Sequence, residues 1–531
     1  MKSGNYTFSQ VPSAEIPRSS FDRSHTLKTT FDAGPLIPIF CDEVLPGDTF
    51  NLRTSGFARL ATPLYPIMDN MYMDTFYFFV PLRLVWDNFQ KMMGEQDNPG
   101  DSTDFITPGI VAPDSGGWDE LSLADYFGLP TKLDSLISTS LPLRAYRLIY
   151  NEWFRDQNLQ DSLAVSKGDG PDPVDYGLEP SIRGKRHDYF TSCLPFPQKA
   201  DAVTIPLSSD FANVVPGQDG NPPVSPDSWL LRGGTSTTYD MVQDGSVSAN
   251  LQMDNLGSFA ASNVLPYLQA DLTNVTIATI NQLREAFQIQ KLYERDARGG
   301  TRYTEIIRAH FGVTSPDARL QRPEYLGGGS TPINITPIAQ TADTASVGGA
   351  GTVGQLGAMG TTSFSGHGFN KSFTEHGIII GLVNVRADLT YQQGINRMWT
   401  RTDRTSYYWP ALAHLGEQAV LNAEIYVYDP DPAKNTEVFG YQERFAEYRY
   451  KPSQITGLFR SNATQSLDAW HLSQNFGSLP VLNDEFISED PPIDRVIVTE
   501  DEPHFIADFH HKLRCVRPMP LYGVPGNIDR F

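Results

Sequence analysis

The chain has 531 residues, of which 41 are Lys or Arg and 62 are Asp or Glu, so its formal net charge is −21. Apolar residues make up 40% of the chain and aromatic residues 11%, enough for a large hydrophobic core. Composition therefore excludes a disordered chain, a collagen and a coiled coil, and the acidic balance is atypical of a free-standing nucleic-acid-binding domain.

Most periodic segments alternate apolar and polar residues with period two, the pattern of β-strands. Met71–Val80 is apolar on nearly both faces and ends at Pro81, which predicts a strand buried on both sides. Further strands are expected at His376–Arg386, Ala419–Tyr428, Arg495–Thr499 and Phe505–Val516. An antiparallel sandwich or barrel accounts for this distribution best.

Helical periodicity is less common and lies between the strands. Pro142–Phe154 opens with a proline in a first-turn position and places its aromatic residues on one stripe. Thr276–Arg298 is a second expected helix, and Tyr303–His310 a third, closed by Gly312. We interpret the aromatic stripes as core packing.

Two segments break the periodic pattern. Residues 201–275 hold eight aspartates and one basic residue, Arg232, together with apolar groups, and are expected to form a large surface insertion. Residues 326–370 have eleven glycines and one charged residue, Asp343, and are predicted to form an extended arm or loop. The expected organisation is a core in two parts, 1–200 and 276–531, interrupted by the insertion 201–275.

The sequence contains several motif-like segments, but the residues around them do not fit a catalytic, cofactor or metal site. Gly349–Gly354 matches a dinucleotide fingerprint in letters only, because no strand precedes it and no helix follows. Arg183–His187 could touch phosphates but is expected to form a turn or to pair with nearby acids, and Asp169–Asp175 lacks the pattern of a calcium loop. His510 and His511 would point to opposite faces of a strand and could not chelate a metal together. We therefore predict no catalytic residue, cofactor or metal site.

Targeting signals are also missing from the sequence pattern. No apolar stretch follows Lys2, and the most apolar run, 377–385, is too short for a membrane helix of about 20 residues. Three widely spaced cysteines, Cys41, Cys193 and Cys515, predict buried free thiols in a reducing cytoplasm. We expect a soluble protein made inside the cell.

Several long runs of this chain are distinctive: Phe21–Pro38, Glu43–Asp48, Met73–Trp86, Arg183–Phe190, Gly299–Tyr303, Phe439–Tyr448, Arg449–Pro452 and Trp470–Leu472. Together these runs resemble the major capsid proteins of microviruses of the gokushovirus branch. The resemblance covers nearly the whole chain except 201–275.

The resemblance implies a mainly β fold, an eight-stranded antiparallel viral jelly roll with long loop insertions that carry short helices. It implies a T=1 icosahedral shell of about sixty copies, because closed symmetry gives each copy an equivalent environment. The shell would enclose a circular single-stranded DNA genome, be assembled in the cytoplasm of a bacterial host, and contain a small basic DNA-binding virion protein. Partners would be other copies of the chain and a host surface receptor, with no membrane insertion.

Basic residues gather near both ends of the otherwise acidic chain: residues 1–30 hold four basic and two acidic residues, and residues 510–531 hold four and one. Basic ends suit an interior surface that neutralises phosphate without reading sequence. The residues expected to face DNA are Arg18, Arg23, Lys28, Lys512, Arg514 and Arg517. Stacking of unpaired bases on Phe21, Phe31 and Phe509 is a further hypothesis.

The variable insertion is expected to form a protrusion at the three-fold axes and to touch the host surface. Its apolar residues are Trp229, Leu230, Leu231, Met241, Val242, Leu251 and Met253. Two alternatives share the sandwich architecture: a carbohydrate-binding jelly roll of a phage fibre or lectin, and a glycoside hydrolase with a carboxylate pair in a cleft.

Overall fold

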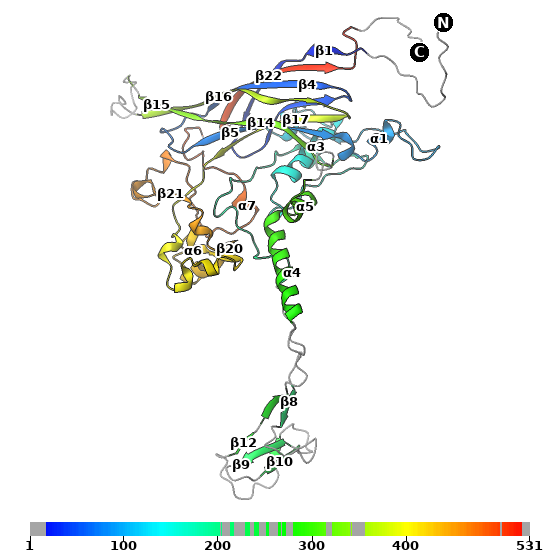
Figure 1. Ribbon diagram of the computed structural model, residues 1–531. Coiled ribbons are helices and arrows are strands. Elements are labelled where there is room, and N and C mark those ends of the chain that lie inside the picture. Colours follow the sequence, from blue (N-terminus) through cyan, green and yellow to red (C-terminus); the bar gives the residue numbers. More distant parts are fainter. Residues whose placement is uncertain are drawn as a thin grey trace. The chain divides into compact units, whose positions relative to one another are not determined.

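The structure is a computed structural model that describes residues 17–201, 203, 280–314, 321–339, 341, 356–499 and 502–522, together with the backbone of six short strands between Asn213 and Asp271. It has two compact units (Figure 1). The first comprises residues up to Pro197 and from Ala297 onward, and the second is Gln198–Asp296. Both are rich in antiparallel sheet, which confirms the expected mainly β class.

A six-stranded antiparallel sheet, called the first sheet here, follows the order β1-β22-β4-β16-β15, with β2 also paired to β22. Its strands are β1 (Ser19–Asp22), β2 (His25–Phe31), β4 (Thr49–Leu60), β15 (Asn334–Ala339), β16 (Leu356–Ser372) and β22 (Phe505–Arg517). The expected strand 505–516 is thus confirmed as β22, which pairs with β4 along most of its length. β22 alternates buried and exposed residues, so one face of this sheet is covered and the other is open.

The second sheet has the order β14-β5-β17-β3 and lies against the covered face of the first (Figure 1). Its strands are β3 (Ile37–Val44), β5 (Met71–Pro81), β14 (Glu324–Pro332) and β17 (Gly377–Ala387). β5 and β17 are buried on both faces, as their mainly apolar sequences predict.

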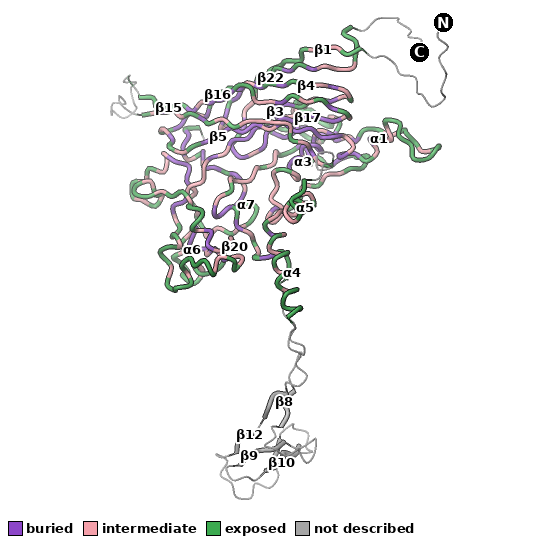
Figure 2. Tube along the Cα trace, in the orientation of Figure 1, coloured by how far each residue is buried: buried purple, intermediate pink, exposed green. Residues whose placement is uncertain are grey.

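The hydrophobic core of this unit lies between the two sheets and on the far face of the second sheet, and buried residues concentrate between and below the sheets in Figure 2. Phe31, Val383 and Phe509 pack in one cluster between the two sheets, and Phe50 and Phe79 in a neighbouring one. The far face of the second sheet is covered by Trp86, Trp118 and Tyr146 from the long β5–β14 connection. This covering layer leaves only the far side of the first sheet open.

The helices belong to the connections between strands, and all of them except the 20-residue α4 are short. They are α1 (Phe89–Met92), α2 (Leu123–Tyr126), α3 (Leu141–Ile149), α4 (Ile280–Gly299), α5 (Tyr303–Phe311), α6 (Asn422–Ile425) and α7 (Asp484–Ile487). α3 continues as a π-helical turn over Tyr150–Phe154, so the expected helix 142–154 is confirmed, with Pro142 in its first turn. α5 ends at Gly312, whose φ is 68°. The start of the expected helix 276–298 lies outside the described residues before Ile280.

The connections also carry short paired strands. They are β6 (Gly109–Val111) with β7 (Ile137–Thr139), β18 (Thr390–Tyr391) with β21 (Ser453–Gln454), and β19 (Glu417–Leu421) with β20 (Val438–Glu443). Cys193 and Cys515 are buried, as predicted, whereas Cys41 is exposed, and all three are free thiols. Among the described residues, no helix is both long and apolar enough to span a membrane.

Two expected strands are wrong. The strand predicted at 419–428 stops at Leu421, where Glu424 Oε1 accepts the Leu421 N–H at 3.0 Å and starts α6 instead. Residues 495–499 make a turn with one isolated bridge, between Ile497 and Pro63. Val496 and Ile497 are buried in the core between the sheets, so their apolar pattern reports burial rather than strand pairing.

The predicted glycine-rich arm is also wrong for the part of 326–370 that the structure describes. This part forms β14, β15 and β16, which belong to both sheets, and Phe364 and Phe369 are core residues. The glycines allow close packing: a Cβ at Gly328 would overlap the carbonyl oxygen of Thr75, and one at Gly368 that of Leu52. The fingerprint-like Gly349–Gly354 lies outside the described residues.

The second unit contains β8 (Asn213–Pro216), β9 (Trp229–Gly233), β10 (Thr238–Gln243), β11 (Leu251–Met253), β12 (Val264–Pro266) and β13 (Leu268–Asp271). Four of them form a sheet in the order β11-β10-β9-β12, and β13 pairs with β8. Trp229, Met241 and Met253 lie directly opposite one another on adjacent strands. The backbone therefore brings together three of the apolar residues that the sequence analysis selected.

Candidate nucleic-acid interface

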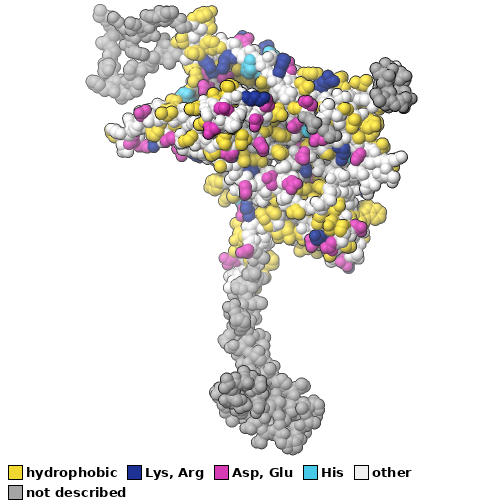
Figure 3. Space-filling view, turned by 180° about the vertical axis from the view of Figure 1, so that it is seen from behind, with side chains coloured by type: hydrophobic (Ala, Val, Ile, Leu, Met, Phe, Trp, Pro, Cys, Tyr) yellow, Lys and Arg dark blue, Asp and Glu magenta, His cyan; other side chains and the backbone are white. Residues whose placement is uncertain are grey.

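The open face of the first sheet, called the outer face below, is made by alternate residues of β4, β22, β2 and β16. On β4 the residues Phe50, Leu52, Ala58 and Leu60 point into the core, so Asn51, Arg53, Ser55, Phe57 and Arg59 are on the outer face. The same alternation on β22 buries His511 and Leu513 and exposes His510, Lys512 and Arg514. Figure 3 shows Lys, Arg and His side chains gathered along the top of the molecule, over this sheet.

Positive charges are unbalanced on this face. Lys512 lies directly opposite Arg53 in the β22–β4 ladder, and like charges in that arrangement destabilise a sheet. Within the described part of the chain, Arg53 and Arg59 make neither an ion pair nor a side-chain hydrogen bond, and Lys512 and Arg514 make no ion pair within 4.0 Å. An anionic partner would relieve this repulsion.

Acidic groups on the same face are few. Asp508 pairs with Lys28 at 2.9 Å across the β2–β22 ladder. The pKa of Asp22 is lowered, mainly by hydrogen bonds from Ser24 and additionally by the charges of Arg514 and Lys512. Asp22 therefore stays ionised near them without forming a close ion pair. The face remains positive because its basic residues outnumber Asp22 and Asp508.

The six basic residues expected to face DNA all lie on or beside β1, β2 and β22, but they divide into two groups. Arg18 donates to Gly47 O, Arg23 pairs with Asp42, and Arg517 Nε lies 3.1 Å from Oδ2 of the buried Asp48. These three hold the end of the sheet together. Lys28, Lys512 and Arg514 are exposed and more available to a ligand.

The aromatic part of the hypothesis is wrong for two residues. Phe31 and Phe509 are fully buried between the sheets and cannot stack on a base, and Phe21 is half-buried. Their alternation places them on the covered side of β2 and β22. The aromatic ring on the outer face is Phe57, which is 53% exposed.

The paired histidines separate as expected, since His510 is exposed and His511 is buried. His511 Nδ1 lies 2.9 Å from Thr54 Oγ1, which also accepts a hydrogen bond from the hydroxyl of Tyr77. Burial lowers the pKa of His511 to about 4, and the charge of His25 contributes in the same direction. The ring is therefore uncharged at neutral pH and adds nothing to the charge of the outer face.

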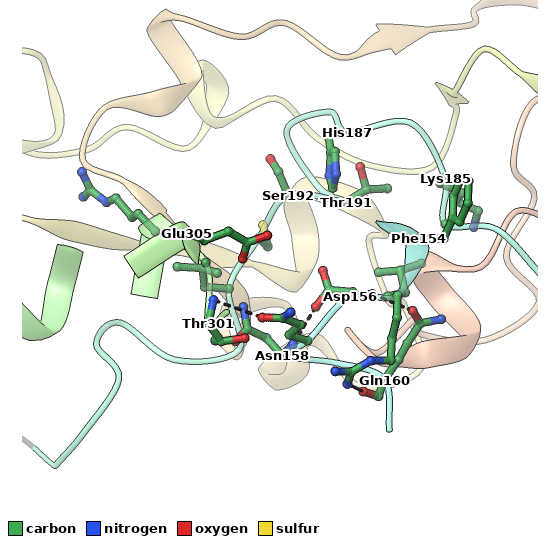
Figure 4. Close-up of a pocket in the computed structure, with 18 of the residues that line it drawn as sticks. Phe154, Asp156, Asn158, Gln160, Lys185, His187, Thr191, Ser192, Thr301 and Glu305 are labelled. Carbon is green, nitrogen blue, oxygen red and sulfur yellow. Dashed lines mark hydrogen bonds between the residues drawn. The ribbon is translucent and has the colours of Figure 1, made fainter. Parts of the chain in front are cut away.

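A second region rich in arginine surrounds a cavity of about 1150 Å³ in the connections. Figure 4 shows its lining from three segments, around Asp156, around His187 and around Thr301. Arg183 pairs with Asp74 at 2.8 Å and Arg186 with Asp388 at 3.1 Å, which confirms that this motif pairs with nearby acids. The charges of Arg183 and Arg186 at this cavity are thus balanced by the chain's own carboxylates.

Glu489 belongs to the same charged cluster. Its Oε1 accepts the Ala387 N–H at 3.1 Å, and burial raises its pKa to about 7 despite the opposing charges of Arg386, Lys185 and Arg183. The cluster therefore gains or loses one charge near neutral pH.

The acidic run 169–175 is also satisfied within the chain. Asp172 makes a bidentate ion pair with the buried Arg144, and Asp169 Oδ1 accepts the indole N–H of Trp86 at 2.7 Å. No group of three or more His, Cys, Asp or Glu side chains that could hold a metal ion is found in the described ranges.

The comparisons with known proteins agree with one another. The model of the phage capsid protein (F protein) family matches residues 9–527. The chain belongs to this family. Capsid protein VP1 of Bdellovibrio phage phiMH2K is 46% identical to this capsid protein over 99% of the chain and 98% of its own length. Capsid protein VP1 of Chlamydia phage 1 is 44% identical, and that of Spiroplasma virus 4 is 38% identical, each over 98% of this chain and 97% of its own length.

These matches confirm the resemblance to microvirus capsid proteins of the gokushovirus branch. The capsid protein has a structural role in the virion, and its family implies self-assembly rather than enzymatic work.

The structure describes the outer face of this capsid protein with its side chains, but only the backbone of the insertion strands. Leu230, Leu231, Val242 and Leu251 lie in β9, β10 and β11, but the side chains of the insertion are outside the described residues. Arg53 and Arg59 were missed because charge was counted only near the chain ends. The signal was present in the alternation of residues 50–60, where both arginines are out of phase with the apolar residues.

Proposed function

We propose that the two sheets of the first unit form the eight-stranded viral jelly roll. In chain order β2, β3, β4 and β5 alternate between the first and second sheets, and β14, β16, β17 and β22 continue as second, first, second and first. The orders β2-β22-β4-β16 and β14-β5-β17-β3 are those of two interlocked Greek keys, which supports this topology. β1 then extends β2, and β15 is an added edge strand.

About sixty copies of the chain assemble into a T=1 shell around a circular single-stranded DNA genome, with the outer face of the first sheet turned to the interior. The observation that carries this proposal is the unbalanced charge of that face, where Lys512 and Arg53 are cross-strand neighbours. Phosphates neutralise such charge without base recognition. A small basic virion protein supplies the rest, because few basic residues of this acidic chain lie there.

Contacts between copies are favoured by an exposed aromatic cluster in the connection between β17 and β22. Trp399 is 72% exposed, and Tyr407, Tyr408 and Trp409 are between 41% and 52% exposed. Arg404 lies over the Trp409 ring, whose indole N–H donates to Arg404 O at 2.9 Å. Rigid, exposed Trp, Tyr and Arg side chains are typical of interface hot spots.

The insertion 201–275 is proposed to be the variable outward protrusion, between the two core parts 1–200 and 276–531, and to contact the host receptor. Its support is the strongly acidic composition and the apolar strand residues. Assembly would take place in the cytoplasm of the bacterial host.

The test is the DNA content of particles that carry Lys512→Gln and Arg514→Gln. We expect less nuclease-protected DNA per particle, because two unpaired cations leave the interior. The matched control is Lys167→Gln with Lys451→Gln, which removes the same charge from two exposed positions in the connections, where neither lysine makes an ion pair with the described residues. Equal DNA content in both double variants would contradict the assignment of this face to the genome.

A further inference from the structure

One end of the outer face carries a hollow of about 650 Å³. Its floor is formed by Phe57 and Arg59 of β4 and by Ile506 of β22, and its wall by Leu121 and Tyr126 of the β5–β14 connection. Small-molecule sites typically enclose about 300 to 1,000 Å³, so the hollow is large enough for one nucleotide.

The hollow is apolar at its centre, although it opens on a positively charged face. Phe57 is 53% exposed, Ile506 63% and Leu121 39%. Phe57 and Ile506 are on neighbouring strands, because Ile506 lies opposite Arg59 and Asp508 opposite Phe57. An exposed aromatic ring beside exposed aliphatic groups offers a planar apolar ligand a stacking surface.

The wall is held in a strained conformation. Leu121 has φ of 65°, in the left-handed region, which costs a non-glycine residue about 1 kcal/mol or more. Its N–H donates to Asp125 Oδ2 at 3.0 Å, and Asp125 N–H donates to Ser122 Oγ at 3.2 Å. The loop therefore adopts a strained backbone conformation that keeps the apolar Leu121 side chain partly exposed. Backbone strain of this kind is characteristic of ligand-binding positions.

The polar groups of the lining are of both signs. Arg59 makes no ion pair or side-chain hydrogen bond with the described residues, whereas Lys28 is paired with Asp508. Oδ1 of Asp508 is buried and accepts no hydrogen bond from the described chain. Asp125 and Asp508 disfavour an anion inside the hollow, and because Asp508 Oδ1 is buried, the hollow favours the apolar part of a ligand over its charged part.

We propose that this hollow binds one unpaired nucleotide of single-stranded DNA. The base stacks on Phe57 between Ile506 and Leu121, and the attached phosphate is bound outside the hollow by Arg59. Aromatic stacking with a neighbouring cation is the usual means of binding unpaired bases without strict sequence preference. The inference rests on the proposed DNA-facing role of the outer face and adds a base-binding subsite to it.

The test is binding of a short mixed-sequence single-stranded oligonucleotide to the full-length, unassembled chain over a series of salt concentrations. Phe57→Leu is expected to weaken binding about 5- to 150-fold, the loss of one stacked base, with an unchanged slope of log K against log salt. Arg59→Gln is expected to reduce that slope by about 0.7, the contribution of one phosphate contact to a single strand. Phe57→Trp should retain the affinity.

The control is Trp399→Leu, which removes an exposed aromatic ring far from β4 in sequence and should leave DNA binding unchanged. Salt-dependent binding that is equally strong in wild type and Phe57→Leu would overturn the subsite and leave the proposed function standing. No salt-dependent binding by the wild-type chain would overturn the proposed role of the outer face itself. Thermal melts of each variant check that its fold is intact.

Discussion

The buried ion pair between Arg144 and Asp172 offers the sharpest test of how the long connection is held on the second sheet. The Arg144 side chain is 0% exposed and that of Asp172 1%. Arg144 donates to both carboxylate oxygens of Asp172, at 2.5 and 2.7 Å, and its Nη1 also donates to Val85 O and Gly168 O. Asp172→Asn keeps the shape and removes the charge, which leaves a guanidinium in the core with neutral acceptors alone.

Loss of one partner from a buried ion pair costs about 3 to 5 kcal/mol, and we expect that loss in the free energy of unfolding of Asp172→Asn. Urea denaturation of the unassembled chain measures it. The matched control is Asp175→Asn, three residues further on, whose carboxylate is 59% exposed and 3.6 Å from Arg147. That exposed pair is worth at most about 1 kcal/mol.

The double variant Arg144→Met with Asp172→Leu should recover much of the loss, because no charge is then left buried. Equal stability of Asp172→Asn and Asp175→Asn would refute the argument that this ion pair anchors the connection.

Three further predictions concern pH and packing. In the folded chain the pKa of Glu489 is raised to about 7, so its buried carboxyl ionises between pH 5 and pH 8. Over that range the free energy of unfolding of the wild-type chain should fall by about 2 to 3 kcal/mol relative to that of Glu489→Gln measured at the same two pH values. For His511 the pH dependence is opposite, because its pKa is lowered to about 4 in the folded chain. Lowering the pH from 7 to 5 should reduce the free energy of unfolding by about 2 kcal/mol relative to His511→Asn. Equal pH profiles of the two chains would contradict this prediction. Gly328→Ala should lower the urea midpoint by the equivalent of at least about 1 to 3 kcal/mol, because its Cβ overlaps a backbone oxygen, whereas Gly357→Ala, with its nearest atom 3.8 Å away, should be tolerated.

The strands that the sequence predicts best are those whose residues are mainly apolar or alternate regularly between apolar and polar. β5, β17 and β22 were predictable because burial on one or both faces determines their residues directly. The prediction for 495–499 was wrong because Val496 and Ile497 enter the core with one isolated bridge and no strand ladder, and periodicity alone does not distinguish these cases. β14 and β16 were not predicted because their glycines indicate a flexible segment in the sequence. In the structure these glycines are needed where the backbone of a distant strand comes close.

The sequence predicted where the candidate interface lies but not which residues form it. Basic residues near both chain ends indicated a positive surface, and β1, β2 and β22 do lie together at one edge of the first sheet. Which of them are free depended on partners far away in sequence, such as Asp48 for Arg517. Arg53 and Arg59 join the face only because β4 pairs with β22, a pairing that sequence reasoning did not establish.

The central claim is that copies of this chain form a closed shell that contains single-stranded DNA. The most direct measurement is the mass of the purified particle, by light scattering, together with its nuclease-protected DNA. The account predicts about sixty copies of a 59.0 kDa chain, about 3.5 MDa of protein, and protected single-stranded DNA inside. A stable monomer or trimer without nucleic acid under conditions of assembly would contradict it.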